Sequence, residues 1–246
     1  MDEPASKPPP PSLSDLALEQ AIALFLDFDG TLVEIAAEPG SLDVSADLGA
    51  RLAASADRLD GRLALVSGRA IENLELHCGP LRLACAGSHG AALRAADGAI
   101  IQTADPLPTE VIAQVMDWAE ETGADHEAKP HGAALHSRAR PELEESCALF
   151  LEGLADRHGL AVKRGKMVAE LVRRGADKAA AVRSFMARAP FAGAMPIFVG
   201  DDVTDEDGFA ACEEAGGFGV IVGERQSQYA RFALPNPKVV AQWIGL

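Results

Sequence analysis

The sequence lacks the features that mark zinc-knuckle, disulfide-stabilised and membrane-spanning proteins. It contains four cysteines in 246 residues, and none of them belongs to a CxxC pair. This spacing favours free thiols over a zinc knuckle or a redox pair. No apolar run reaches the roughly 20 residues that a membrane-spanning helix needs. With 48% hydrophobic and 24% charged residues, the composition is instead that of an ordinary globular protein.

Basic side chains are also scarce. The chain has 22 lysines and arginines against 37 aspartates and glutamates, which gives a net charge of −15 at pH 7. Such a charge repels both the phosphate backbone of nucleic acids and anionic membrane surfaces. We therefore expect neither a nucleic-acid nor a membrane partner.

The amino-terminal segment reads MDEPASKPPPPSLSDL and lacks the apolar stretch of a secretory signal. Its proline content predicts a disordered tail over residues 1–18. We accordingly expect a cytoplasmic protein.

Short apolar runs alternate with helical patterns after this segment. The run from Ala21 to Leu26 ends at Asp27, Leu63 to Val66 ends at Ser67, and further runs cover Leu83 to Ala86, Pro196 to Val199 and Val220 to Val222. Continuous apolar strands of this length are typical of a parallel sheet that is buried on both faces. The sequence thus predicts an α/β fold with a doubly wound parallel sheet.

The pattern changes between residues 106 and 174. Here a helix (Glu110 to Glu121), two strands, a longer helix (Glu142 to His158) and two more strands follow one another. Proline and glycine residues stand at both ends, as at a domain boundary. We therefore predict a core made of residues 19–105 and 175–246, with an inserted α/β cap over 106–174.

Polar residues follow three of the predicted strands. They are Asp27-Phe28-Asp29-Gly30-Thr31, Ser67-Gly68-Arg69 and Gly200-Asp201-Asp202-Val203-Thr204-Asp205. In an open α/β sheet the ligand crevice lies at the carboxyl ends of the strands. Each cluster taken alone is also what a solvated loop or a helix cap contains. If they converge, like charges 4 Å apart repel by about 4 kcal/mol at an effective dielectric near 20, and a divalent cation with oxygen ligands, Mg²⁺ or Ca²⁺, would offset this.

These motifs resemble those of a known superfamily. DFDGT at Asp27, SGR at Ser67, the lysine at Lys178 and GDDVTDED at Gly200 are similar, in the same order, to the four motifs of the haloacid dehalogenase (HAD) phosphatases. The GSHG segment at Gly87 and the insert extend the resemblance to the trehalose-6-phosphate phosphatase family. Two positions depart from that family: Ala179 stands where glycine is usual, and Arg173-Arg174 stands where an arginine and a proline are usual.

The resemblance implies roles for the core residues. Asp27 would be the nucleophile and a metal ligand, and Asp29 the acid/base with its backbone carbonyl on the metal. Lys178 would neutralise developing charge. The remaining implied metal residues are Asp201, Asp202 and Asp205, and the implied phosphate-binding residues are Thr31, Ser67 and Gly68.

The resemblance also implies a substrate. Glu127, Lys129 and Glu170 of the insert match positions that grip glucose hydroxyls, and further contacts would come from Arg69, His89, His136 and Arg138. We expect a monomeric, Mg²⁺-dependent enzyme that hydrolyses trehalose 6-phosphate through an aspartyl-phosphate.

Rival interpretations remain open at this point. Another capped HAD sugar phosphatase or phosphomutase, acting on sucrose phosphate or a mannosyl-phosphoglycerate, would carry the same core motifs. A receiver domain or a non-catalytic binding subunit would use a similar sheet. The receiver domain lacks the cap and the DFDGT motif, and a binding subunit would usually have lost one of the four motifs.

Overall fold

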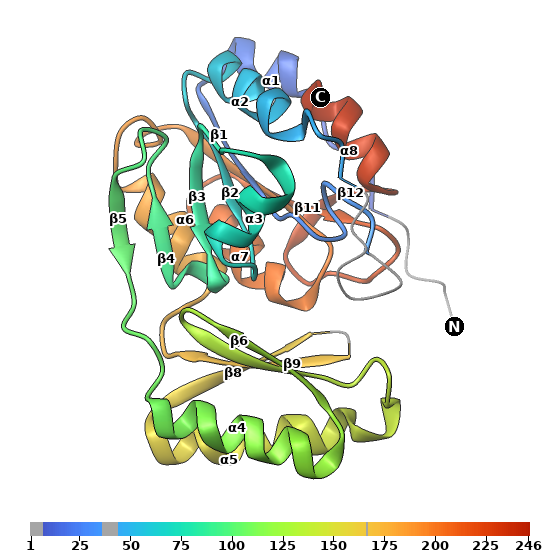
Figure 1. The fold of residues 1–246 in the computed structure, drawn as a ribbon. Coiled ribbons are helices and arrows are strands. Elements are labelled where there is room, and N and C mark those ends of the chain that lie inside the picture. Colours follow the sequence, from blue (N-terminus) through green and yellow to red (C-terminus); the bar gives the residue numbers. More distant parts are fainter. Residues whose placement is uncertain (1–6, 36–43, 166) are drawn as a thin grey trace, which may run out of the picture.

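The computed structural model describes residues 7–35, 44–165 and 167–246. It contains one sheet of eight strands and one of four. Figure 1 shows the larger sheet with its helices in the upper part and the smaller sheet below, with two helices on its far side. The predicted α/β fold with a parallel core sheet is therefore confirmed.

The larger sheet has the strand order β12-β11-β10-β1-β2-β3-β4-β5, in which all neighbours from β12 to β3 run parallel and the last two pairs are antiparallel. Every residue of β1, β2 and β3 is buried, which is why these segments are uniformly apolar. The strands are β1 (Ile22–Leu26), β2 (Leu63–Val66), β3 (Ala84–Gly87), β4 (Ala92–Arg94), β5 (Ile100–Thr103), β10 (Met195–Gly200), β11 (Phe218–Val222) and β12 (Ala230–Leu234).

Helices cover both faces of this sheet. Ile22, Leu24 and Leu26 of β1 pack into one apolar cluster with α1 (Leu13–Glu19), α2 (Leu48–Arg58), α3 (Ile71–Cys78) and α8 (Pro237–Ile244). Ala23 and Phe25 pack into a second cluster with α6 (Lys178–Met186) and α7 (Glu206–Glu214). Successive strand residues point to opposite faces, so one apolar run supplies both layers.

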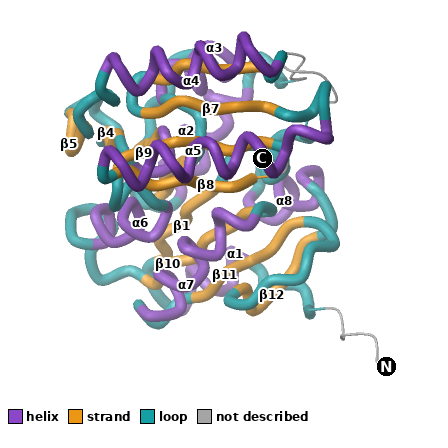
Figure 2. Tube along the Cα trace, turned by 90° about the horizontal axis from the view of Figure 1, so that it is seen from below, coloured by secondary structure: helices purple, strands orange, loops and turns teal. Residues whose placement is uncertain are grey.

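The smaller sheet is antiparallel and has the order β6-β7-β9-β8. One face packs on α4 (Thr109–Thr122) and α5 (Glu144–His158) around a third apolar cluster. Figure 2, seen from below, shows these two helices in front of the strands. The strands are β6 (Asp125–Lys129), β7 (Gly132–His136), β8 (Leu160–Gly165) and β9 (Val168–Arg173), all within the segment predicted as the insert.

The amino-terminal segment corrects one prediction. Residues 13–19 form helix α1, and the backbone carbonyls of Pro8 and Pro11 accept hydrogen bonds from Ala233 N (3.0 Å) and Trp243 Nε1 (2.8 Å). The disordered tail predicted over residues 1–18 is therefore wrong for residues 7–18, because the proline-rich segment docks on β12 and α8. Residues 1–6 lie outside the described part of the chain.

Within the described ranges, no helix combines the length and the apolar character needed to cross a membrane.

Candidate active site and metal centre

The carboxyl ends of three strands meet at the centre of the larger sheet. Strand β1 lies between β10 and β2, with Leu26 opposite Val199 and Leu65. The backbone N–H of Asp27 donates to Val199 O at 2.9 Å, so the two acidic motifs start side by side. The topology thus brings together segments that are about 170 residues apart in the chain.

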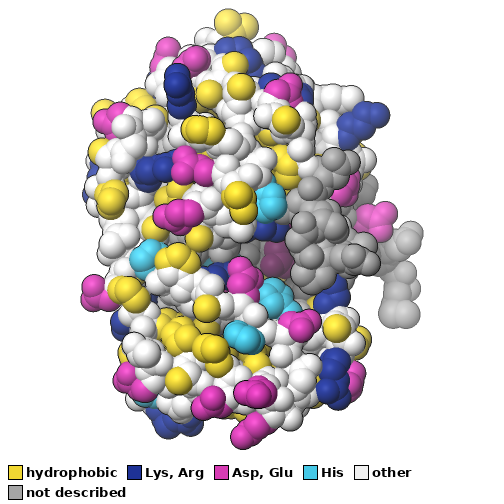
Figure 3. Space-filling model, in the orientation of Figure 1, with side chains coloured by type: hydrophobic (Ala, Val, Ile, Leu, Met, Phe, Trp, Pro, Cys, Tyr) yellow, Lys and Arg dark blue, Asp and Glu magenta, His cyan; other side chains and the backbone are white. Residues whose placement is uncertain are grey.

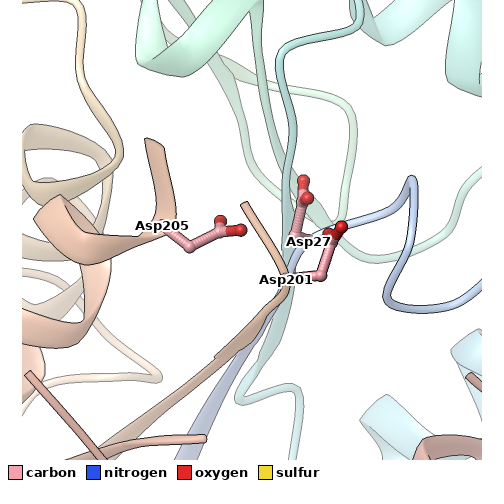
Figure 4. A group of neighbouring side chains, drawn as sticks. All are labelled: Asp27, Asp201 and Asp205. Atoms are coloured by element: carbon pink, nitrogen blue, oxygen red, sulfur yellow. The ribbon is translucent and has the colours of Figure 1, made fainter. Parts of the chain in front are cut away.

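Three carboxylates gather there. Asp27, Asp201 and Asp205 each offer one oxygen, and these oxygens lie within 4.8 Å of one another. Figure 4 shows Asp27 and Asp201 just after β1 and β10, with Asp205 facing them from the turn before α7. Asp27 is 5% exposed and Asp205 is fully buried. The chain therefore concentrates like charges in a place with little water to screen them.

The pKa values reflect this crowding. Burial raises the pKa of Asp27 well above its usual value, and the neighbouring Asp205 and Asp201 add to the effect against the opposing charge of Lys178. Burial and Asp205 raise the pKa of Asp201 to about 7. A divalent cation would remove this penalty, and carboxylate oxygens are the ligands that hard cations prefer. The donor set therefore fits a metal ion.

Lys178 is the positive charge that the chain itself supplies. It is buried at the start of α6, and its Nζ lies 3.0 Å from Asp27 Oδ1 and 2.5 Å from Asp205 Oδ1. Although burial acts to lower the pKa of Lys178, Asp205 and Asp27 hold it above its usual value. Asp177 caps the helix by accepting a 2.6 Å hydrogen bond from Ala180 N, which holds Lys178 in the first turn.

The carboxylates of Asp205 and Asp202 are engaged within their own loop. Asp205 Oδ2 accepts from Asp202 N at 2.9 Å, and its Oδ1 accepts from Lys178. The side chain of Asp202 caps the short 3₁₀ helix Val203–Asp205 and lies outside the group of three carboxylates. A metal-ligand role for Asp202 therefore has no support in this geometry.

Asp29 is not one of the three grouped carboxylates and pairs with Arg69 instead. Arg69 Nε and Nη2 donate to its two oxygens at 2.6 and 2.7 Å, and Arg69 Nη1 donates to Asn73 Oδ1 at 2.8 Å. Gly30 makes the intervening turn, with φ +73°. A Cβ at Gly30 would lie 2.1 Å from the Asp201 carboxylate, so the close approach of the two motifs requires glycine.

The predicted phosphate-binding residues border the same space. Thr31 is buried, and its hydroxyl donates to Asp201 Oδ1 at 3.4 Å rather than to Asp27. The Ser67 hydroxyl accepts a 3.1 Å hydrogen bond from Arg69 N. A Cβ at Gly68 would meet the His89 ring at 2.7 Å, so this glycine lets the two loops pack together.

The predicted cap residues share one face of the smaller sheet. Strand pairing places one residue from each of its four strands in a single row: Glu127, Ala134, Glu170 and Lys163. Paired residues project to the same face, and Lys129 and His136 join them by the two-residue period. His136 Nε2 lies 3.1 Å from Glu127 Oε2. Arg138 is exposed, two residues beyond the end of β7.

This face is linked directly to the core. Glu170 Oε2 accepts from Lys129 Nζ at 2.6 Å and lies 3.2 Å from His89 Nε2, and Lys129 Nζ also reaches Gly68 O at 3.4 Å. Burial alone would raise the pKa of Glu170, but His89 and Lys129 lower it to about 2. Lys163 makes a second link, to Asp207 of α7 at 2.7 Å. Figure 3 shows histidine and acidic side chains where the two parts meet.

Sequence reasoning missed five polar residues around the site: Asn73, Lys163, Glu206, Asp207 and Arg225. Glu206 and Asp207 are the last two residues of GDDVTDED, so their place in that motif was the available signal. Asn73, Lys163 and Arg225 lie outside the motifs, and only their position after β2, on the polar face of the smaller sheet or after β11 could have indicated them.

The fold and this site define a capped α/β protein of the HAD type. One structural neighbour is a phosphatase of the haloalkanoate (HAD) enzyme superfamily from Bacteroides thetaiotaomicron, with a TM-score of 0.58, 17% identity and coverage of 92% of this chain and 94% of that chain. The family model described as trehalose-phosphatase matches residues 25–237. The chain therefore belongs to the trehalose-phosphatase family.

Individual relatives agree with this assignment. The chain is 36% identical over 231 residues to trehalose-6-phosphate phosphatase of Escherichia coli (strain K12), covering 92% of this chain and 86% of the relative. It is also 36% identical over 208 residues to a probable trehalose-phosphate phosphatase of Sinorhizobium fredii, covering 82% and 77%. The C-terminal domain of C. albicans trehalose-6-phosphate phosphatase superimposes with a TM-score of 0.83 at 23% identity, covering 99% and 98%.

Proposed function

We propose that the protein is a Mg²⁺-dependent phosphoric monoester hydrolase that converts trehalose 6-phosphate and water into trehalose and inorganic phosphate. One observation carries the chemistry: Asp27 ends β1 beside Lys178 and two further carboxylates. Membership of the trehalose-phosphatase family supports the substrate.

Asp27 is the nucleophile in this proposal. A carboxylate oxygen of Asp27 attacks phosphorus, the bond between phosphorus and the sugar oxygen breaks, and an aspartyl-phosphate forms. Water then attacks phosphorus and releases phosphate, which regenerates the carboxylate. Lys178, 3.0 Å from Asp27, offsets the charge on the phosphoryl oxygens.

Asp27 and Asp201 would hold the metal ion, with the backbone carbonyl of Asp29 as a third ligand and Asp205 beside them. When bound, Mg²⁺ supplies positive charge that keeps Asp27 ionised and neutralises phosphoryl oxygens. Oxygen-only donors favour Mg²⁺ or Ca²⁺ over softer metals.

Asp29 transfers the protons. It donates one to the departing sugar oxygen and later accepts one from the attacking water. Because both of its oxygens are bonded to Arg69, this pair has to open first. The phosphate group of the substrate is a stronger partner for a guanidinium than a single carboxylate and would draw Arg69 away.

The smaller sheet binds the sugar. Among the described residues, neither Glu170 Oε1 nor His89 Nδ1 has a hydrogen-bond partner, although both atoms are buried. An unsatisfied buried polar group costs about 1–3 kcal/mol, so a sugar hydroxyl placed there gains affinity. Glu127 and Lys129, on the same face, offer further charged partners for hydroxyl groups.

Phosphate release from a panel of esters tests the function. With Mg²⁺ we expect trehalose 6-phosphate to be hydrolysed with a higher kcat/KM than sucrose 6-phosphate or glucose 6-phosphate. Excess EDTA should abolish the release, and added Mg²⁺ should restore it. Full activity in EDTA would exclude the metal role, and a preference for another ester would exclude the named substrate.

Asp27→Asn tests the nucleophile. The amide has the same shape but cannot attack phosphorus, so we expect the rate to fall more than tenfold while the chain still folds. Asp57→Asn, an exposed position on α2, serves as the control. Retention of a tenth of the rate, a loss of only ~1.4 kcal/mol in barrier, would contradict the assignment.

A further inference from the structure

The loop between β11 and β12 holds the backbone of the acidic loop that follows β10. Arg225 Nε donates to Asp201 O at 3.0 Å, and Arg225 Nη2 donates to Asp202 O at 2.9 Å. One guanidinium thus binds two consecutive carbonyls, the first of them in a residue of the carboxylate group. A planar fork of this kind fixes the orientation of both peptide units at once.

Glu206 holds the guanidinium in place. Its Oε1 accepts from Arg225 Nη2 at 2.7 Å. Its Oε2 accepts from Ser227 Oγ, Gln228 N and Tyr229 N, at 3.0, 3.2 and 3.1 Å. Glu206 therefore ties the β11–β12 loop to the first turn of α7, and it remains hydrogen-bonded even when Arg225 is removed.

The opposite side of the acidic loop is held as well. Asp205 Oδ2 accepts from Asp202 N, and Asp205 Oδ1 accepts from Lys178. The backbone between Asp201 and Asp205 is consequently bonded from two sides. The side chain of Asp201, directed toward Asp27 and touched by Thr31, is the part that remains available to a cation.

We propose that Arg225 and Glu206 are positioning residues that hold Asp201 in the geometry in which it binds the metal ion. The inference rests on the metal role of Asp201 in the proposed function. Because the charges of Arg225 and Glu206 neutralise each other, the pair acts through geometry and adds little net charge near the cation. Outer partners of metal ligands commonly contribute 10- to 100-fold in metal affinity.

Mg²⁺ binding to the metal-free full chain, measured by calorimetry, tests this proposal directly. We expect Arg225→Ala to raise the Kd for Mg²⁺ by 10- to 100-fold and to lower kcat at limiting Mg²⁺. KM for the phosphate ester at saturating Mg²⁺ should change less than twofold. Arg225→Lys should bind with intermediate affinity, because an ammonium group cannot hold both carbonyls in the same way.

Arg94→Ala is the matched control. Arg94 Nη2 donates to Glu75 Oε1 at 2.8 Å and to Leu81 O at 3.4 Å, and the side-chain exposures of this pair, 20% and 30%, resemble the 29% and 16% of Arg225 and Glu206. The Arg94→Ala variant should lose a comparable ion pair and keep the wild-type Kd for Mg²⁺. If Arg225→Ala does not fold, Arg225→Lys and Glu206→Gln still test the positioning role, since each should raise the Kd for Mg²⁺.

Wild-type affinity in Arg225→Ala or Arg225→Lys, or equal weakening in Arg94→Ala, would overturn the proposal. So would a wild-type chain that binds no Mg²⁺. Failure of the proposed function has a different signature: the wild-type chain would bind Mg²⁺, and Arg225 variants would weaken that binding, while no sugar phosphate is hydrolysed.

Discussion

At the scale of single residues, one buried carboxylate joins the two sheets. Glu170 is 4% exposed, and its partners come from both parts of the molecule: Lys129 lies on β6, and His89 lies in the loop after β3. A carboxylate in such a place contributes to stability only while it is ionised. Removing it leaves the buried Lys129 ammonium without its carboxylate partner.

The pH dependence of stability follows from the lowered pKa of Glu170. The pKa of Glu170 is about 2 in the folded protein, whereas its ordinary value is 4.5. The contribution of Glu170 to the free energy of unfolding is therefore complete above pH 4.5 and is lost as the pH falls toward 2. We expect Glu170→Gln to be less stable than the wild type by an amount on the order of 3 kcal/mol at pH 6. Urea denaturation from pH 6 to pH 3 measures the difference, which should shrink as the pH falls. A difference that stays constant over this range would contradict the lowered pKa.

At the scale of elements, the start of helix α6 fixes the position of Lys178. Helix α6 begins directly after Asp177, whose side chain caps it, and Lys178 is its first residue. The cap fixes the first turn, so the lysine enters the site from a rigid element rather than from a loop.

Replacing this cap should therefore affect stability in a specific way. We expect Asp177→Ala to lower the free energy of unfolding by about 1 kcal/mol, because Ala180 N loses its acceptor. Asp177→Ser keeps an oxygen at the same place and should recover most of the loss. Chemical denaturation at pH 7 compares the three proteins. A serine variant no more stable than the alanine variant would show that the cap is not the cause.

At the scale of the whole molecule, the proposed function assigns substrate specificity and phosphate-ester chemistry to different sheets. Asp27 follows β1 of the larger sheet and Lys178 begins α6, which packs on that sheet, whereas Glu127 and Lys129 lie on the polar face of the smaller sheet. The rate of hydrolysis of a substrate that occupies only the core site should not depend on the side chains of the smaller sheet. This separation can be tested with two substrates of different size.

Glu127→Ala is the most suitable variant, because the Glu127 side chain is half exposed and its partner, His136, belongs to the same sheet. We expect kcat/KM for trehalose 6-phosphate to fall roughly ten- to two-hundredfold, as the loss of a hydrogen bond to a charged group implies. Hydrolysis of p-nitrophenyl phosphate should change little.

Glu152→Ala is the control for this variant, since Glu152 lies on α5 and pairs with Arg164 on the other side of the smaller sheet. It should leave both substrates unaffected. A parallel fall for both substrates in Glu127→Ala would contradict the assignment of sugar recognition to this face.

The sequence by itself determined the elements of the core and indicated the residues to which the proposed function assigns the chemistry. Apolar runs such as Ala21 to Leu26 predicted buried strands because burial on both faces demands continuous apolar side chains. The two-residue period predicted that Glu127 and Lys129 share a face, and strand pairing bears this out. The acidic motifs after two strands predicted a shared site, because parallel strands end at one edge of a sheet.

The tertiary structure decided which polar groups meet. Arg69 pairs with Asp29 rather than standing apart, Lys129 reaches Glu170 on a distant strand, and Arg225 bonds to the carbonyl of Asp201. The proline-rich segment likewise became ordered only because Trp243 and β12 lie beside it. Local patterns depend on periodicity and burial, which a sequence displays directly. Pairings between distant residues depend on strand order and loop paths, and these exist only once the chain has folded.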